Sequence, residues 1–282
     1  MGDAVAVIRA GFSWALVAAA LLAAVAFSSR SSDAQTCDDI AAYGKLVGQA
    51  DDRYSGVTVP LVIHIMERPS PGHDSCDVRQ HWTREQVAVV FGPSIDDPRG
   101  VNSIWGPVGI RLVIREVLRH EYVAPDGMLT AVPMGPKGSD AFEAGFNTLV
   151  AALHRPGSVN VYLWDRMAGP DNPMGFGRSP RSGNGKATVW LDRVCVNTDL
   201  EKPKDCARGV AHELGHALGL YHSPPTPCAG VPGTDPASCE AVSRSCAEVA
   251  DLARLMAKRA VGDTKLCPAE VKEAVDMTKR LK

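Results

Sequence analysis

The feature that most constrains this chain is the segment from His212 to His222. It runs His-Glu-Leu-Gly-His-Ala-Leu-Gly-Leu-Tyr-His, so the glutamate is Glu213 and the middle histidine is His216. Histidines four residues apart lie on one face of an α-helix, where His212 and His216 can bind one metal ion. Gly219 predicts the end of this helix, because glycine adopts the left-handed conformation at little cost. The chain would then turn and bring His222 back as a third ligand.

The three histidines predict a catalytic rather than a structural zinc site. Three neutral imidazoles leave one tetrahedral position open for water, whose pKa zinc lowers toward neutrality. Glu213 follows the first ligand directly and would accept the proton from this zinc-activated water as general base. Scattered histidines in a core helix are a serious alternative for HExxH alone, but the full motif fixes five positions. A zinc-binding homologue that has lost activity is the stronger alternative, although Glu213 is intact.

These residues resemble the metzincin clan of zinc metallopeptidases, whose signature is this motif followed by a methionine turn. Met256, followed by Gly262 and the segment 266–271, is similar to the turn methionine and the start of a C-terminal helix. The resemblance implies that Met256 lies beneath the zinc. Ordinary core filling is the alternative for a single methionine.

Features around the motif point to different families of the clan. Ser223 follows the third histidine, as in matrixins, whereas the cysteine-containing stretch between His222 and Met256 is more like pappalysin-type members. No matrixin-type cysteine-switch sequence is present. The resemblance covers residues 57–281 and is strongest at 207–223.

The N-terminal segment 1–34 predicts export. A short start containing Arg9 precedes a small-residue apolar run, and cleavage is expected after Ala34. An uncleaved anchor is the alternative, because the run is about as long as a short membrane span. The protein is therefore expected to be secreted, or to lie in the periplasm or at the cell surface if the leader is retained. Residues 35–56 would form a short N-terminal segment and 57–282 a single metallopeptidase catalytic domain.

The eight cysteines agree with an oxidising compartment, because an even number without CxxC pairs predicts disulfides. A Cys195–Cys206 bond would fix the approach to the metal helix. A bond from the 228–246 segment to Cys267 would brace the methionine turn. The alternative for Cys37 is a latency ligand on zinc. The cysteines are Cys37, Cys76, Cys195, Cys206, Cys228, Cys239, Cys246 and Cys267.

The charge distribution narrows the range of partners. The formal net charge is −2 and there is no basic tract, so neither nucleic-acid binding nor electrostatic membrane attachment is supported. We expect a monomer that acts on a protein or peptide substrate, with no nucleic acid and with no membrane contact after leader cleavage.

Hydrophobic patterning predicts an α/β fold with a mixed twisted sheet. Apolar, β-branched runs predict strands at 58–66, 109–115, 159–164 and 186–192. Capping patterns predict a helix from Thr83, a helix from Ser139 or Asp140, and a last helix opening at Cys267-Pro268. The apolar pattern of the first of these is interrupted at Gly92-Pro93 and Asp97-Pro98 and resumes at Val101. The resemblance implies a catalytic domain with two long helices above the cleft and a smaller C-terminal subdomain. His64, inside the first strand, is expected to be a hydrogen-bonded core histidine.

By the same resemblance, Gly175, Phe176 and Gly177 would form an edge strand that binds an extended peptide. A flexible surface loop is the alternative for this glycine-rich stretch. The sequence thus favours a secreted zinc endopeptidase. The alternatives are a catalytically silent extracellular binding protein of the same fold and a zinc hydrolase that acts on small molecules.

Overall fold

The computed structural model describes residues 56–67, 82, 84–121, 140–164, 175–181, 185–192, 203–222, 255–256 and 264–281. The strands are β1 (Val57–Glu67), β2 (Ile110–Glu121), β3 (Val159–Trp164), β4 (Gly175–Arg178) and β5 (Thr188–Asp192). The helices are α3 (Arg84–Phe91), α4 (Asn102–Trp105), α5 (Asp140–Leu153), α7 (Pro203–Ala217) and α9 (Pro268–Thr278), with a short 3-10 turn at Gly106–Val108. The leader, the segment 35–55 and most of the cysteines lie outside the described residues.

The strands form one mixed sheet in the order β2-β1-β3-β5-β4. β1 runs parallel to β2 and to β3, and β3 runs parallel to β5. β4 alone is antiparallel and forms the edge next to β5. The α/β class predicted from the sequence is therefore correct at this level, and the 175–178 segment is a strand at the end of the sheet.

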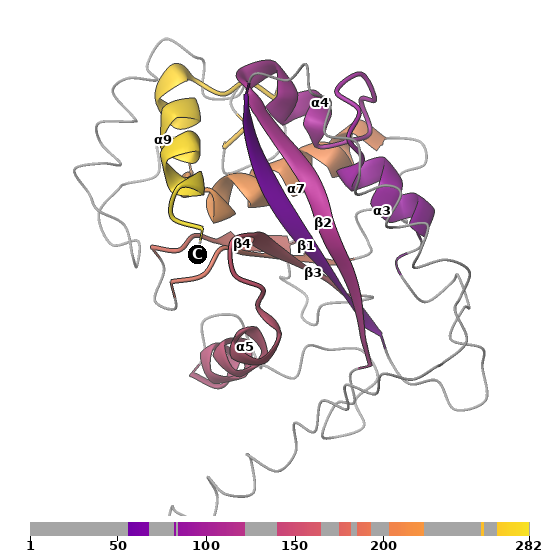
Figure 1. Ribbon diagram of the computed structural model, residues 1–282, viewed down its shortest axis with the longest axis vertical. Coiled ribbons are helices and arrows are strands. Elements are labelled where there is room, and N and C mark those ends of the chain that lie inside the picture. Colours follow the sequence, from indigo (N-terminus) through magenta and orange to yellow (C-terminus); the bar gives the residue numbers. More distant parts are fainter. Residues whose placement is uncertain are drawn as a thin grey trace, which may run out of the picture.

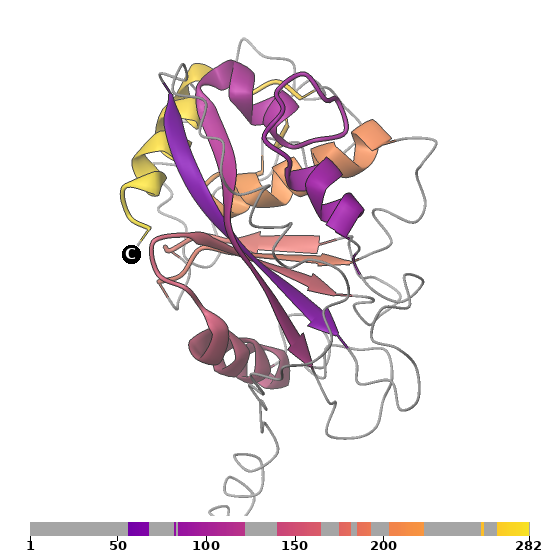
Figure 2. The ribbon, with the colours of Figure 1, turned by 45° about the vertical axis from the view of Figure 1, so that its right-hand side comes forward.

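The two faces of the sheet pack against different helices. Along β3, Val159, Val161 and Leu163 enter one apolar cluster with α7 and the helices between β1 and β2, while Tyr162 and Trp164 enter a second cluster with α5. Figure 2 shows α5 on one side of the sheet and α3, α4 and α7 on the other.

The predicted helix after β1 is divided where the sequence interrupts its apolar pattern. α3 ends at Phe91 after eight residues. Gly92 weakens a helix, and a proline at 93 disfavours helical backbone in the residue before it. The chain resumes as α4, where Asn102 donates to the carbonyls of Gly92 and Leu112 and accepts from the Leu112 N–H. This buried amide ties the helix break to β2.

The last helix begins as predicted. Pro268 occupies the first turn, and Cys267 and Glu270 form a capping box, with the Cys267 N–H donating to the Glu270 carboxylate over 2.9 Å. The Cys267 side chain is disulfide-bonded. Ala274 and Met277 are buried and face the core. Within the described part of the chain, no helix has the length and apolar character of a membrane span.

Candidate metal centre

The metal centre is built on α7, whose buried face carries the apolar positions of the motif. Ala207, Val210, Ala211 and Leu214 are fully buried against the sheet. The helix ends in a Schellman turn, in which the Leu220 N–H donates to the Gly215 carbonyl and the Gly219 N–H donates to the His216 carbonyl. Gly219 has φ +85°, as this turn requires. The reversal brings His222 back over the helix.

The structure brings the three predicted ligands together. His222 Nε2 lies 3.3 Å from His212 Nε2 and 3.1 Å from His216 Nε2. Two nitrogens on a tetrahedral zinc, each about 2.0–2.1 Å from the metal, are about 3.3–3.4 Å apart. The two separations that involve His222 therefore fit zinc, and the three ligand atoms all lie within 4.8 Å of one another. Among the described residues, this is the one cluster of at least three groups able to hold a metal.

Main-chain carbonyls fix the tautomers of two of these rings. His212 Nδ1 lies 2.8 Å from the carbonyl oxygen of Leu255, and His216 Nδ1 lies 2.8 Å from that of Leu220. A carbonyl only accepts, so each Nδ1 carries the proton and each Nε2 presents its lone pair to the centre. Burial is the main cause that lowers the pKa of His212, which keeps this ring in the neutral form that binds metal.

Both carbonyls are functional groups that the motif did not reveal. Leu255 is 43 positions away from His212 in the sequence. A main-chain acceptor leaves no side-chain signature, so no residue pattern could have found it. The Leu220 carbonyl could have been predicted more readily than that of Leu255, because the glycine turn at 219 directs it back toward the helix.

Glu213 lies where α7 meets the edge strand. The residue is half-buried, and its carbonyl oxygen occupies the space that a Cβ at Gly177 would need. The Glu213 Cγ lies 3.4 Å from the corresponding position at Gly175. The two glycines of β4 thus bring the strand into direct contact with the metal helix, and the Glu213 side chain passes beside it. Figure 1 shows β4 running next to α7.

Phe176 points to the other side of the sheet, away from the metal helix. It packs in the α5 cluster, where its ring stacks on Trp190 with a centroid distance of 5.7 Å. Of the three residues of the predicted substrate strand, Gly175 and Gly177 therefore face α7, while Phe176 packs on the opposite face of the sheet.

Met256 lies directly beneath the metal helix. It is completely buried, and a Cβ at Gly215 would come within 2.5 Å of its sulfur. The turn that carries Met256 is held by a hydrogen bond from the Leu255 N–H to the Lys265 carbonyl. The same turn thus supplies both the Leu255 carbonyl that orients His212 and the methionine that packs under α7. A glycine inside a helix is costly, so Gly215 was the sequence signal for this close packing.

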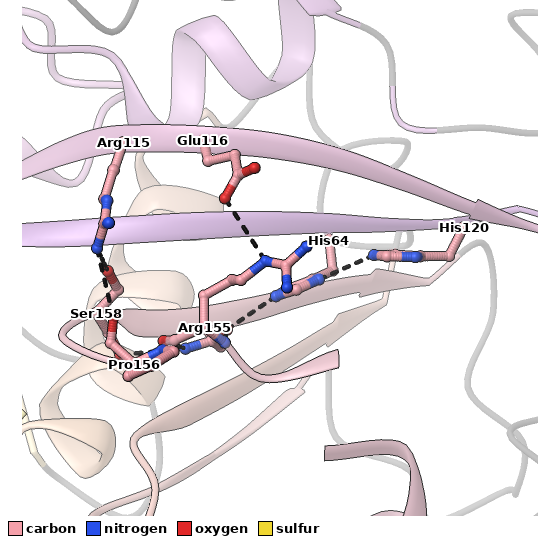
Figure 3. A network of polar contacts seen from close by, with 8 residues as sticks. His64, Arg115, Glu116, His120, Arg155, Pro156 and Ser158 are labelled. Atoms are coloured by element: carbon pink, nitrogen blue, oxygen red, sulfur yellow. Dashed lines mark hydrogen bonds and ion pairs between the residues drawn. The ribbon is translucent and has the colours of Figure 1, made fainter. Parts of the chain in front are cut away.

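A second group of histidines lies on the opposite face of the sheet and is drawn in Figure 3. His64 Nε2 lies 2.9 Å from the Asn160 side-chain oxygen, and His64 Nδ1 lies 3.0 Å from His120 Nε2. The Asn160 amide group donates to two main-chain carbonyls, so its oxygen must accept and His64 must donate from Nε2. His64 is fully buried with hydrogen bonds at both ring nitrogens, as expected for a core histidine.

Comparisons with known proteins add little to this geometry. No protein-family model matches the sequence, and neither does any curated protein. Among solved structures, the chain is similar to an archaemetzincin from Methanopyrus kandleri with 14% sequence identity and a TM-score of 0.38. The similarity spans 80% of this chain and 98% of that one. A likeness with this TM-score supports no functional assignment.

Proposed function

We propose that this protein is a secreted zinc-dependent endopeptidase. The observation that carries the proposal is the convergence of the His212, His216 and His222 ring nitrogens within 4.8 Å of one another, beside Glu213 and an edge strand. When bound there, zinc would lower the pKa of a water molecule and polarise a peptide carbonyl. The remaining chemistry belongs to the side chains and main chain of the site.

Glu213 is the general base in this proposal. It is adjacent to a ligand rather than one turn away, so its carboxylate is not on the metal-binding face formed by the histidines. From its place between α7 and β4 it takes a proton from the attacking water and passes it to the leaving amine. Its half-buried position strengthens these electrostatic interactions relative to bulk water.

β4 is the substrate-binding element in this proposal. An extended peptide adds to the edge of a sheet through main-chain hydrogen bonds, which are independent of side-chain identity. β4 ends the sheet and contacts the helix that carries Glu213. A peptide paired with β4 would therefore lie along the metal centre, and this favours a polypeptide substrate over a small molecule.

Export completes the proposal. A leader at 1–34 would direct the chain out of the cytoplasm, where the predicted disulfides could form. Met256, packed under Gly215, would support the base of the site rather than bind metal, as the resemblance to metzincins implies.

The deciding experiment uses protein expressed from the full chain under oxidising conditions and loaded with zinc. Incubation with an unbiased peptide library should give internal cleavages that disappear with a chelator and in Glu213→Ala. Both preparations should bind one zinc, since Glu213 is not a ligand. Stoichiometric zinc in the wild-type protein without any cleavage would contradict the endopeptidase proposal and favour a binding protein. Hydrolysis of small esters or amides without peptide cleavage would favour the small-molecule hydrolase.

A further inference from the structure

A charged pair links the end of the edge strand to the C-terminal helix. Arg181 Nη2 lies 2.5 Å from Glu273 Oε1, and the two side chains are 22% and 19% exposed. The contact is a close ion pair rather than a well-aligned hydrogen bond. Because both groups are mostly removed from water, their attraction is screened less than that of a surface pair.

The same carboxylate lies next to the turn that leads to the third metal ligand. A Cβ at Gly219 would be 3.7 Å from Glu273 Oε1 and 2.6 Å from the Met277 methyl group. α9 therefore packs closely on the turn after α7, as Figure 1 also shows. Leu220, the next residue, supplies the carbonyl that orients His216. One face of α9 thus contacts the metal-binding turn with Met277 and the end of β4 with Glu273.

β4 itself is held at several points. Its four residues pair with β5, Phe176 packs in the α5 cluster, and Gly177 lies against the Glu213 carbonyl. Arg181, three residues beyond the last residue of β4, ties the segment that leaves this strand to α9. The ion pair therefore fixes the continuation of the edge strand beside the turn that leads to the third metal ligand.

We propose that Arg181 and Glu273 are positioning residues for substrate binding, because their ion pair fixes the segment that continues β4 against α9, beside the metal-binding turn. This inference rests on the proposed role of β4 as the strand that pairs with the peptide. Neither residue touches the metal ligands, so the pair acts on how the peptide is held and not on the chemical step.

The test compares three variants of the full-length, zinc-loaded protein. Glu273→Gln removes the charge with little change in shape and should raise KM for a cleaved peptide by about tenfold, with kcat and zinc content unchanged. The charge-swapped double variant, Arg181→Glu with Glu273→Arg, should restore KM to within about threefold of wild type. Asp276→Asn is the matched control, because it removes a charge from the same helix where Asp276 pairs with the exposed Lys272 and Lys279. A KM in Glu273→Gln equal to that of the control would overturn the inference.

Hydrogen exchange separates this inference from the proposed function. Amides of the segment 175–181 should exchange at least several-fold faster in Glu273→Gln than in wild type or Asp276→Asn, while those of α7 are unchanged. Faster exchange in Glu273→Gln, together with no peptide cleavage by the wild-type protein, would reject the peptidase and support the structural link. Unchanged exchange in this segment would reject the link, whatever the activity.

Discussion

At the scale of single residues, the orientation of the histidines at the metal centre depends on the main-chain carbonyls beside them. The histidine spacing predicted that His212 and His216 would lie on one face of a helix, because an interval of four residues corresponds to about one helical turn. It could not predict that the Leu255 carbonyl would fix the tautomer of His212, since that contact joins segments far apart in the chain. The side chains in the sequence thus indicate which residues could bind a metal. The groups that orient those residues come from distant segments and depend on tertiary structure.

The packing of Met256 on Gly215 gives a prediction at the same scale. Met256→Ala should destabilise the fold by about 2–5 kcal/mol, because the side chain is fully buried. Gly215→Ala should cost about 1–3 kcal/mol, because the new methyl group would overlap the methionine sulfur. In the double variant, the Cβ occupies space that the methionine has left. Its total cost should therefore be less than the sum by about 1 kcal/mol or more.

Urea denaturation of the four proteins measures this coupling. The comparison is made without metal, so that altered zinc affinity does not enter the free energies. Additive costs would show that Met256 and Gly215 do not compete for the same space, and would remove the structural basis for placing Met256 beneath the site.

At the scale of elements, hydrophobic periodicity located the strands but not their arrangement. Alternation in 159–164 predicted β3, yet the strand order and the side on which α5 packs depend on contacts between distant segments. The division of the helix after β1 was predicted, because Gly92-Pro93 interrupts an apolar pattern that resumes at Val101.

The contact between β4 and α7 gives a prediction for these two elements. Gly177→Ala should destabilise the protein by about 1–3 kcal/mol, because the added Cβ would overlap the Glu213 carbonyl and cannot be relieved by a side-chain rotation. Under the proposed function it should also reduce kcat/KM, since the strand and the general base would move apart.

Thermal unfolding and zinc titration together test this contact. Thr148→Ala, at an exposed position of α5, is a control for an alanine substitution away from the interface. Zinc stoichiometry should remain at one in Gly177→Ala, because the ligands lie on α7 and the turn that follows it. A variant as stable and as active as Thr148→Ala would show that α7 and β4 tolerate a wider separation than the structure has.

At the scale of the whole molecule, the face of the sheet opposite the metal centre is joined by stacked rings. His64 stacks on Tyr162 and Tyr162 on Trp190, with centroid distances of 4.6 and 4.8 Å. Phe176 of β4 continues the row. The edge strand beside the metal is therefore anchored through aromatic packing that reaches the centre of the sheet. This buried environment favours the neutral form of the His64 ring, so protonation of the ring would lower the stability of the fold.

Burial on this face predicts acid destabilisation. It is the main cause that lowers the pKa of His64 to about 3 and the pKa values of His120 and His154 to about 4. In the unfolded chain a histidine has a pKa of about 6.5, so between pH 6.5 and pH 4 the unfolded state binds more protons than the folded state. Stability should therefore fall as pH decreases through this window, with each histidine contributing up to about 1.4 kcal/mol per pH unit.

His120→Gln removes one such group while keeping an amide that can donate to His64. Chemical denaturation in the presence of a chelator, at intervals from pH 7 to pH 4, should give a shallower decline for His120→Gln than for wild type, by about one proton. Coincident slopes would mean that His120 titrates in the folded protein as it does in the unfolded chain, and that its burial does not keep it neutral.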